Sequence, residues 1–112
     1  MVLAAEVGEG LGDAKFEALI RRTKDVAKWS RGLRGGGRFQ LGQWQWQRMG
    51  WARERGRVFL VSRLPGTDAR AAFAEPYPTL QAAVEAAVRA TGARRMVVVP
   101  EGPYVVTRGT RG

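Results

Sequence analysis

The hydrophobic positions of the chain alternate between short apolar runs and helical patterns. Apolar runs over 2–5, 58–61 and 96–99 are bounded by charged, glycine or proline residues, which is typical of short strands. Because the runs at 58–61 and 96–99 are uninterrupted, they predict strands buried on both faces of a parallel sheet. Residues 75–78 are predicted to be extended by two prolines.

Helices are predicted between these strands. Asp13 is a suitable N-cap for a helix that reaches the mid-twenties, and a second helix is predicted over about 43–55, ending at Gly56. A loop over 30–42 separates the two, and residues 68–74 are predicted to form a short helix.

The clearest helix is predicted over 79–91, with Thr79 capping its start and Gly92 its end. Its apolar positions recur at i, i+3, i+4, i+7 and i+8. They are Leu80, Ala83, Val84, Ala87 and Val88.

The order strand, helix, helix, strand, helix, strand indicates a small layered α/β domain. We expect a mostly parallel sheet with flanking helices, a partial Rossmann-like arrangement. At 112 residues the chain is expected to form one domain, over 1–106, followed by a frayed tail at 107–112.

The segment Gln43-Trp44-Gln45-Trp46-Gln47 places two indoles and three amides on about one and a half helical turns, and Trp51 follows. On a helix, Trp44 shares a face with Gln47 or Arg48 and with Trp51. A buried Trp needs a partner for its N–H group. The segment is therefore a pocket wall, a docking surface or an unusual piece of core.

The composition excludes several kinds of chemistry. The chain has no cysteine and no histidine, so disulfides, thiolate nucleophiles and the commonest general base and metal ligand are absent. The carboxylates form no evident pair, and we predict no catalytic residue and no metal ligand. No signal peptide is recognisable and no apolar run approaches the roughly 18 residues of a membrane span. A cytoplasmic protein without membrane contact is expected.

The net charge of +9 arises within residues 21–57, which hold eleven basic and two acidic side chains. The segment is either a solvated surface or the binding site of an acidic partner. Arginine interleaved with tryptophan suits stacking on single-stranded nucleic acid, although aromatic residues at helical spacing more often belong to a core. For that alternative the contacts would be Arg31, Arg34, Arg38 and Arg48.

The glycines of residues 8–12 lie between a strand and a helix, where phosphate-binding loops occur. Their spacing differs from G-x-G-x-x-G, and Glu9 would oppose an anion. A tight turn that needs positive φ is the favoured interpretation.

The order of segments resembles the C-terminal domain of the lactate racemase family, the nickel-pincer-nucleotide-dependent 2-hydroxyacid racemases and epimerases. The resemblance covers almost the whole chain. Its matching pieces are Met1-Val2-Leu3-Ala4-Ala5-Glu6 with the glycine turn and Phe16, Gln43-Trp44-Gln45-Trp46-Gln47, Val58-Phe59-Leu60-Val61-Ser62 with Leu64-Pro65, Thr79-Leu80-Gln81-Ala82-Ala83, and Val99-Pro100-Glu101-Gly102-Pro103-Tyr104.

The resemblance implies that Trp44 forms a wall against the substrate, with Gln43 and Gln47 in support. The family's cofactor, metal ligands and histidine pair belong to an N-terminal domain that this sequence does not contain. No cofactor is then expected on this chain, and the nickel-pincer nucleotide would be present only if a partner chain holds it. The family usually has Asp before the Gln-Trp segment, where this chain has Gly42.

Three hypotheses follow. The chain is the C-terminal-domain-like subunit of a two-chain racemase or epimerase, or a remnant that is inactive alone and self-associates, or a small basic nucleic-acid-binding module. As a stand-alone fragment it would expose the surface that met the missing half, so we expect a homodimer or a partner chain carrying the N-terminal domain.

Overall fold

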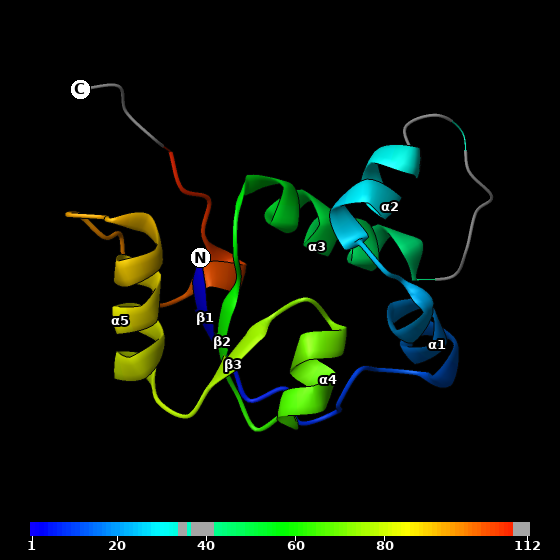
Figure 1. Cartoon of the computed structure of the whole chain (residues 1–112), viewed down its shortest axis with the longest axis horizontal. Coiled ribbons are helices and arrows are strands. Elements are labelled where there is room, and N and C mark those ends of the chain that lie inside the picture. The colour runs from blue at the N-terminus through cyan, green and yellow to red at the C-terminus, as the bar shows by residue number, and fades with distance from the viewer. Residues whose placement is uncertain (34–35, 37–41, 109–112) are drawn as a thin grey trace.

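A computed structural model describes residues 1–33, 36 and 42–108, which form a three-stranded parallel sheet with helices on both faces (Figure 1). The strands are β1 (Val2–Ala4), β2 (Phe59–Val61) and β3 (Glu75–Tyr77), and their order in the sheet follows the sequence. Central β2 pairs with both neighbours in parallel. The predicted α/β class with a parallel sheet is therefore confirmed.

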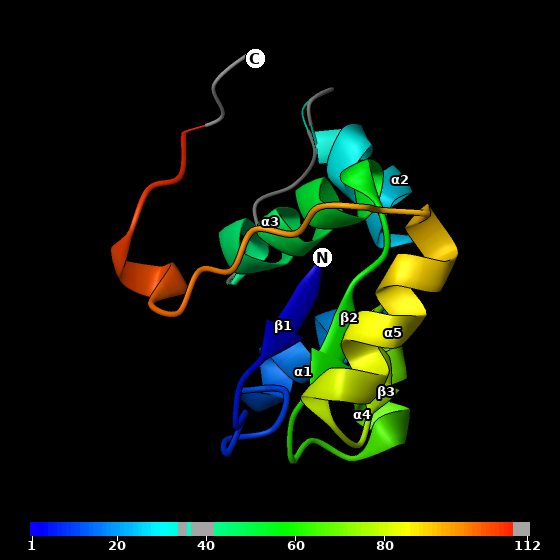
Figure 2. The ribbon, with the colours of Figure 1, turned by 90° about the vertical axis from the view of Figure 1, so that its left-hand side faces the viewer.

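Two layers of helices enclose the sheet, with α5 on one face and the remaining α-helices on the other (Figure 2). No helix in the described ranges is long and apolar enough to cross a membrane. The helices are α1 (Ala14–Arg22), α2 (Val26–Leu33), α3 (Gln43–Arg55), α4 (Gly66–Ala71), α5 (Leu80–Thr91) and the 3-10 helix η1 (Gly102–Tyr104).

Strand β2 is buried on both faces, as its uninterrupted apolar run predicts. Phe59 points into a small cluster with Ala83 and Ala86 of α5. Leu60, the next residue, belongs to the larger core that α1, α3 and α4 build on the opposite face. Alternation of side chains along a strand produces this division, so the central strand links the two cores.

The predicted single helix from Asp13 to the mid-twenties is wrong, because the chain bends between α1 and α2. The Asp13 carboxylate caps α1 by accepting from the backbone N–H of Lys15 and Phe16. Thr23 is extended and ends α1. Asp25 then accepts from the backbone N–H of Lys28 at 3.0 Å in the first turn of α2, so a second capping residue starts a second helix.

The predicted loop over 30–42 is wrong at its start, because α2 continues to Leu33, and the predicted short helix over 68–74 is found as α4 at Gly66–Ala71. The other helix boundaries agree with the predictions. Helix α3 ends at Gly56, and α5 begins after Thr79, whose hydroxyl accepts from a backbone N–H, and ends at Gly92 in the left-handed conformation. The predicted apolar face of α5 is wrong in part, since Leu80 and Val88 are exposed. The sheet has three short strands and is narrow, so it covers only one stripe along the helix. This stripe contains the buried residues Ala83 and Ala86.

The predicted buried strand over 96–99 is also wrong. These residues follow α5 without regular secondary structure, and all four side chains are exposed. The glycine turn has the predicted tight form, with Gly10 at φ +64° and Gly12 at φ +93°. Residues 107–108 have no regular structure, and the rest of the predicted frayed tail lies outside the described residues.

Helices α2 and α3 pack with their backbones unusually close. Gly50 of α3 faces Ser30 of α2, and a Cβ on Gly50 would lie 2.3 Å from the Ser30 Cβ. Ser30 is fully buried, and its hydroxyl has no hydrogen-bond partner among the described residues. The crossing therefore depends on a glycine at position 50.

We predict that Gly50→Ala lowers the free energy of unfolding by about 1–3 kcal/mol, because the added methyl group overpacks the helix crossing. Gly32→Ala is the matched control, since Gly32 also lies in a helix but has no atom near the position of an added Cβ. The control is expected to gain about 0.5–1 kcal/mol from helix propensity. Urea denaturation measures both, and equal effects of the two substitutions would contradict the close crossing.

Candidate functional site

The outward side of α3 carries alternating tryptophan and arginine side chains. Trp44 is 57% exposed and Trp51 is 42% exposed, and Arg48 and Arg55 are exposed on the same helical face. The Arg48 guanidinium lies 5.0 Å from the centre of the Trp44 ring, within range of a cation–π contact. We call these four residues the aromatic–arginine face.

The third indole of α3 points the other way. Trp46 is 2% exposed, and its Nε1–H donates to the Thr23 hydroxyl at 3.0 Å. Phe16 meets the Trp46 ring edge-on at 6.3 Å, and Phe73 lies at 6.0 Å. Of the three interpretations of the Gln-Trp segment, core therefore applies to Trp46, while Trp44 and Trp51 are left as exposed surface.

The structure at the start of α3 explains why Gly42 occupies the position before the Gln-Trp segment, where the resembling family usually has Asp. Gly42 has φ +79°, in the left-handed region, and a Cβ there would lie 2.8 Å from the Phe16 ring. A side chain at this position would require both backbone strain and movement of Phe16. Gln43 and Gln47, the predicted supporting residues, are each partly buried on α3.

The predicted nucleic-acid contacts are only partly brought together. Arg48 belongs to the aromatic–arginine face, while Arg31 is exposed on α2, the helix packed against α3. Arg34 and Arg38 lie outside the described residues. The basic segment thus has exposed arginines on two packed helices, and Arg48 is placed against an exposed tryptophan.

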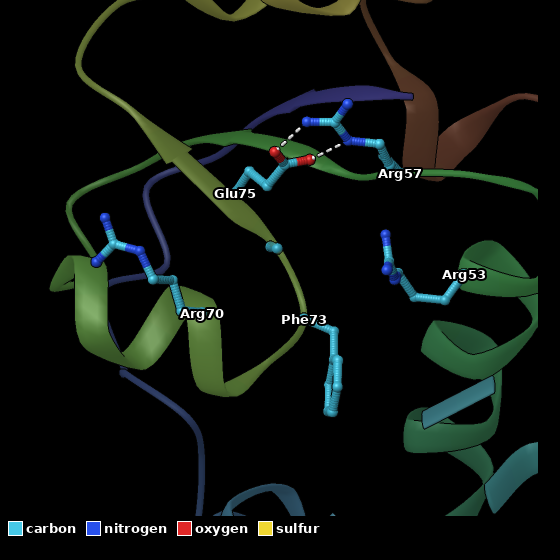
Figure 3. A pocket seen from close by; sticks show the side chains of 6 residues that line it. Arg53, Arg57, Arg70, Phe73 and Glu75 are labelled. Atoms are coloured by element: carbon cyan, nitrogen blue, oxygen red, sulfur yellow. Dashed lines mark hydrogen bonds and ion pairs between the residues drawn. The ribbon is translucent and has the colours of Figure 1, made fainter. Parts of the chain in front are cut away.

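A second arrangement was not predicted from the sequence. A shallow hollow of about 310 Å³ lies between the end of α3 and the start of β3, lined by Arg53, Arg57, Arg70, Phe73, Ala74 and Glu75 (Figure 3). We call it the arginine hollow. Arg57 and Glu75 are joined by two hydrogen bonds, one of them 2.8 Å from Nε to Oε2. Its residues come from two stretches of the chain, 53–57 and 70–75, and no local sequence pattern indicates that these stretches meet.

The ion pair shifts both partners toward their charged forms. Hydrogen bonding from Arg57 lowers the pKa of Glu75 below its ordinary value. The same bond raises the pKa of Arg57. Both side chains are more than a third exposed, so solvent screens the pair. Both carboxylate oxygens of Glu75 accept hydrogen bonds from Arg57. We therefore interpret this pair at the end of the sheet as structural.

The clearest candidate site among the described residues is the aromatic–arginine face of α3. Within them, no group of three or more His, Cys, Asp or Glu side chains is placed to hold a metal ion. The aromatic–arginine face combines flat apolar rings with positive charge, which suits stacking and attraction of anions. No protein-family model matches the chain, and comparisons with curated proteins and with solved structures found no match either.

We predict that Glu75→Gln weakens the dependence of the free energy of unfolding on pH in the acidic range. The folded-state pKa of Glu75 lies below its ordinary value of 4.5, so the folded protein binds fewer protons there than the unfolded chain. The pair therefore stabilises the fold above about pH 4.5 and loses this effect as the pH falls further. Urea denaturation across this range should show the difference between wild type and Glu75→Gln shrinking below pH 4.5.

Glu9→Gln is the control for this experiment, because Glu9 is exposed and makes no side-chain ion pair in the described part of the chain. Its stability should track that of the wild type at every pH. A constant difference between wild type and Glu75→Gln across the titration would contradict the role of the ion pair.

Proposed function

We propose that the chain is a C-terminal-domain-like part of a lactate-racemase-type 2-hydroxyacid racemase or epimerase, inactive by itself. The observation that carries the proposal is the exposed Trp44 at the start of α3. In the resembling family this tryptophan faces the substrate. Here the Arg48 guanidinium lies over its ring and the side chain is 57% exposed, which fits a pocket wall whose other side another polypeptide supplies.

Further support comes from the fold class and from the chemistry of the chain. A parallel three-stranded sheet with helices on both faces agrees with the layered α/β domain that the resemblance implies. The chain has no histidine or cysteine, so the acid/base pair and the ligands of the nickel-pincer nucleotide would come from a partner chain. The role of this domain is then to close the site and exclude water from it.

In this proposal, the positive charge of the aromatic–arginine face attracts the anionic substrate. A 2-hydroxyacid carries a carboxylate, and Arg48 on the Trp44 ring would attract that anion toward the wall. Trp51, two turns along the same face, would contact the partner chain and not the substrate. The proposal therefore divides the face into a pocket end at Trp44 and a docking end at Trp51.

We predict that the tagged chain, purified from its own cells, brings down a nickel-containing histidine-bearing chain, and that this complex interconverts the two lactate enantiomers. Trp44→Ala should lower the rate about 10–100-fold, the effect of misplacing a substrate, while the nickel content of the complex is retained. Chiral chromatography measures the rate and elemental analysis the nickel. The isolated chain should show no activity.

Leu80→Ala is the matched control, because Leu80 is comparably exposed but lies on α5, on the opposite face of the sheet. It should leave the rate unchanged. A complex without nickel, or equal rates for the Trp44→Ala and Leu80→Ala complexes, would refute the racemase proposal.

Single-stranded nucleic acid is the second candidate, favoured by the spacing of Trp44 and Trp51 with Arg48 between them on one helical face. Proteins that bind single strands without sequence preference use exposed aromatic rings to stack on bases and neighbouring arginines to contact phosphates. Arg31 on the adjoining helix would add a phosphate contact. This candidate needs no partner chain.

For this candidate we predict that a labelled oligo(dT) binds with an affinity that falls steeply between 50 and 200 mM salt. Trp51→Ala should weaken binding about 5–150-fold through lost stacking, while Arg31→Ala should mainly reduce the salt dependence. Fluorescence anisotropy measures both, with Leu80→Ala as the control. Absence of binding at low salt would remove the candidate.

A further inference from the structure

The segment after α5 leaves a strongly apolar stretch without cover. Met96, Val97, Val98 and Val99 are all exposed, Val97 to 84%. Three consecutive β-branched residues favour an extended strand, yet the stretch pairs with no strand among the described residues. We call residues 93–108 the C-terminal arm. In Figure 2 it crosses from the end of α5 to the side of the sheet where β1 lies.

The two edges of the sheet differ in what they can accept. On β3, the Glu75 backbone N–H donates to β2, so Pro76 faces the outer edge, where it has no N–H to donate. On β1, the Met1 carbonyl and the Ala5 N–H face β2. Alternation therefore turns the backbone N–H and C=O of Val2 and Ala4 toward the open edge.

Charge decides in which direction a strand would add to β1. An antiparallel strand that places Val98 opposite Val2 and Met96 opposite Ala4 also brings Arg94 toward Glu6, which follows β1 and whose carboxylate lies 3.9 Å from Arg63 of the same chain. The same register places Glu101 near the ammonium group of Met1. A parallel strand would instead bring Arg94 and Arg95 beside that ammonium group and Glu101 beside Glu6, where like charges repel.

The arm cannot reach the antiparallel arrangement on its own sheet. Helix α5 ends beside the end of the sheet where β1 begins (Figure 1), and only residues 92–95 separate it from Met96. This linker spans at most about 14 Å, too short to turn the arm around and enter from the other end. The chain's own arm is therefore limited to the parallel direction that the charges disfavour.

We propose that Met96–Val99 of a second copy adds to β1 as an antiparallel fourth strand, reciprocally, so that two copies form a homodimer by exchanging their arms. Both partners present the same pair of elements, an open edge and an arm, as a two-fold interface requires. The exchange covers the apolar stretch and satisfies the outward backbone groups of Val2 and Ala4. It uses neither the aromatic–arginine face nor the arginine hollow.

The first test uses the absence of native cysteine in the chain. Leu3→Cys and Val97→Cys proteins are mixed and oxidised, because these residues face each other in the proposed register as a non-hydrogen-bonded pair. A disulfide-linked heterodimer is expected. Val106→Cys, on an exposed valine of the same arm outside the stretch, is the matched control and should link poorly to Leu3→Cys.

The second test measures affinity and direction by sedimentation equilibrium. Val97→Asp should weaken the dimer roughly tenfold or more, and Val106→Asp should not, although both side chains are exposed within one chain. Glu6→Arg should weaken it about two- to fivefold, and adding Arg94→Glu should restore it. Circular dichroism checks that each variant keeps its helix content.

Three outcomes would overturn the proposal. The wild type remains a monomer at tens of micromolar, or a Leu3→Cys/Val97→Cys protein forms its disulfide within one chain at high dilution, which shows that the arm covers its own sheet. In the third outcome Val97→Asp and Val106→Asp weaken the dimer equally, which places the contact elsewhere.

Discussion

The burial of Trp46 is the interaction on which the rest of the structure depends. Its indole N–H bonds to Thr23 at the end of α1, and its ring packs on Phe16 of α1 and on Phe73 just after α4. One side chain thereby joins three helices on one face of the sheet. Because side chains two residues before and five residues after it lie on the other side of the helix, fixing Trp46 inward turns Trp44 and Trp51 outward. The candidate site is a consequence of this anchor.

Sequence signals that act over a few residues predicted several helix boundaries and the buried central strand correctly. Asp13, Thr79 and Gly92 cap helices through bonds within a few residues, and their positions gave correct boundaries. The apolar run of β2 likewise predicted its burial. Tertiary packing decided what these signals could not. Which tryptophan is inside depends on contacts with Phe16 and Thr23, and the exposure of Leu80 depends on how narrow the sheet is.

The candidate site was predictable in kind but not in arrangement. The spacing of Trp44, Arg48 and Trp51 placed them on one helical face, and the structure shows that this face is exposed. The arginine hollow depends on β3 lying beside the end of α3, a long-range arrangement with no counterpart in the local pattern. The close approach of Gly50 to Ser30 was hidden for the same reason, since a glycine within a helix does not reveal its neighbour. Both proposed functions use exposed side chains of α3, the helix that the close contact between Gly50 and Ser30 holds against α2.

Pro76 has a consequence for how far assembly can proceed. A sheet with two open edges can add copies at both sides and grow into a fibre. Here the outer edge of β3 lacks an N–H at its central residue, so strand addition is confined to β1. In the proposed dimer, growth through β1 alone would end once two copies have exchanged their arms. If the proposed arm exchange takes place, this proline would separate a closed pair from open-ended polymerisation and would protect the exposed valines from aggregation.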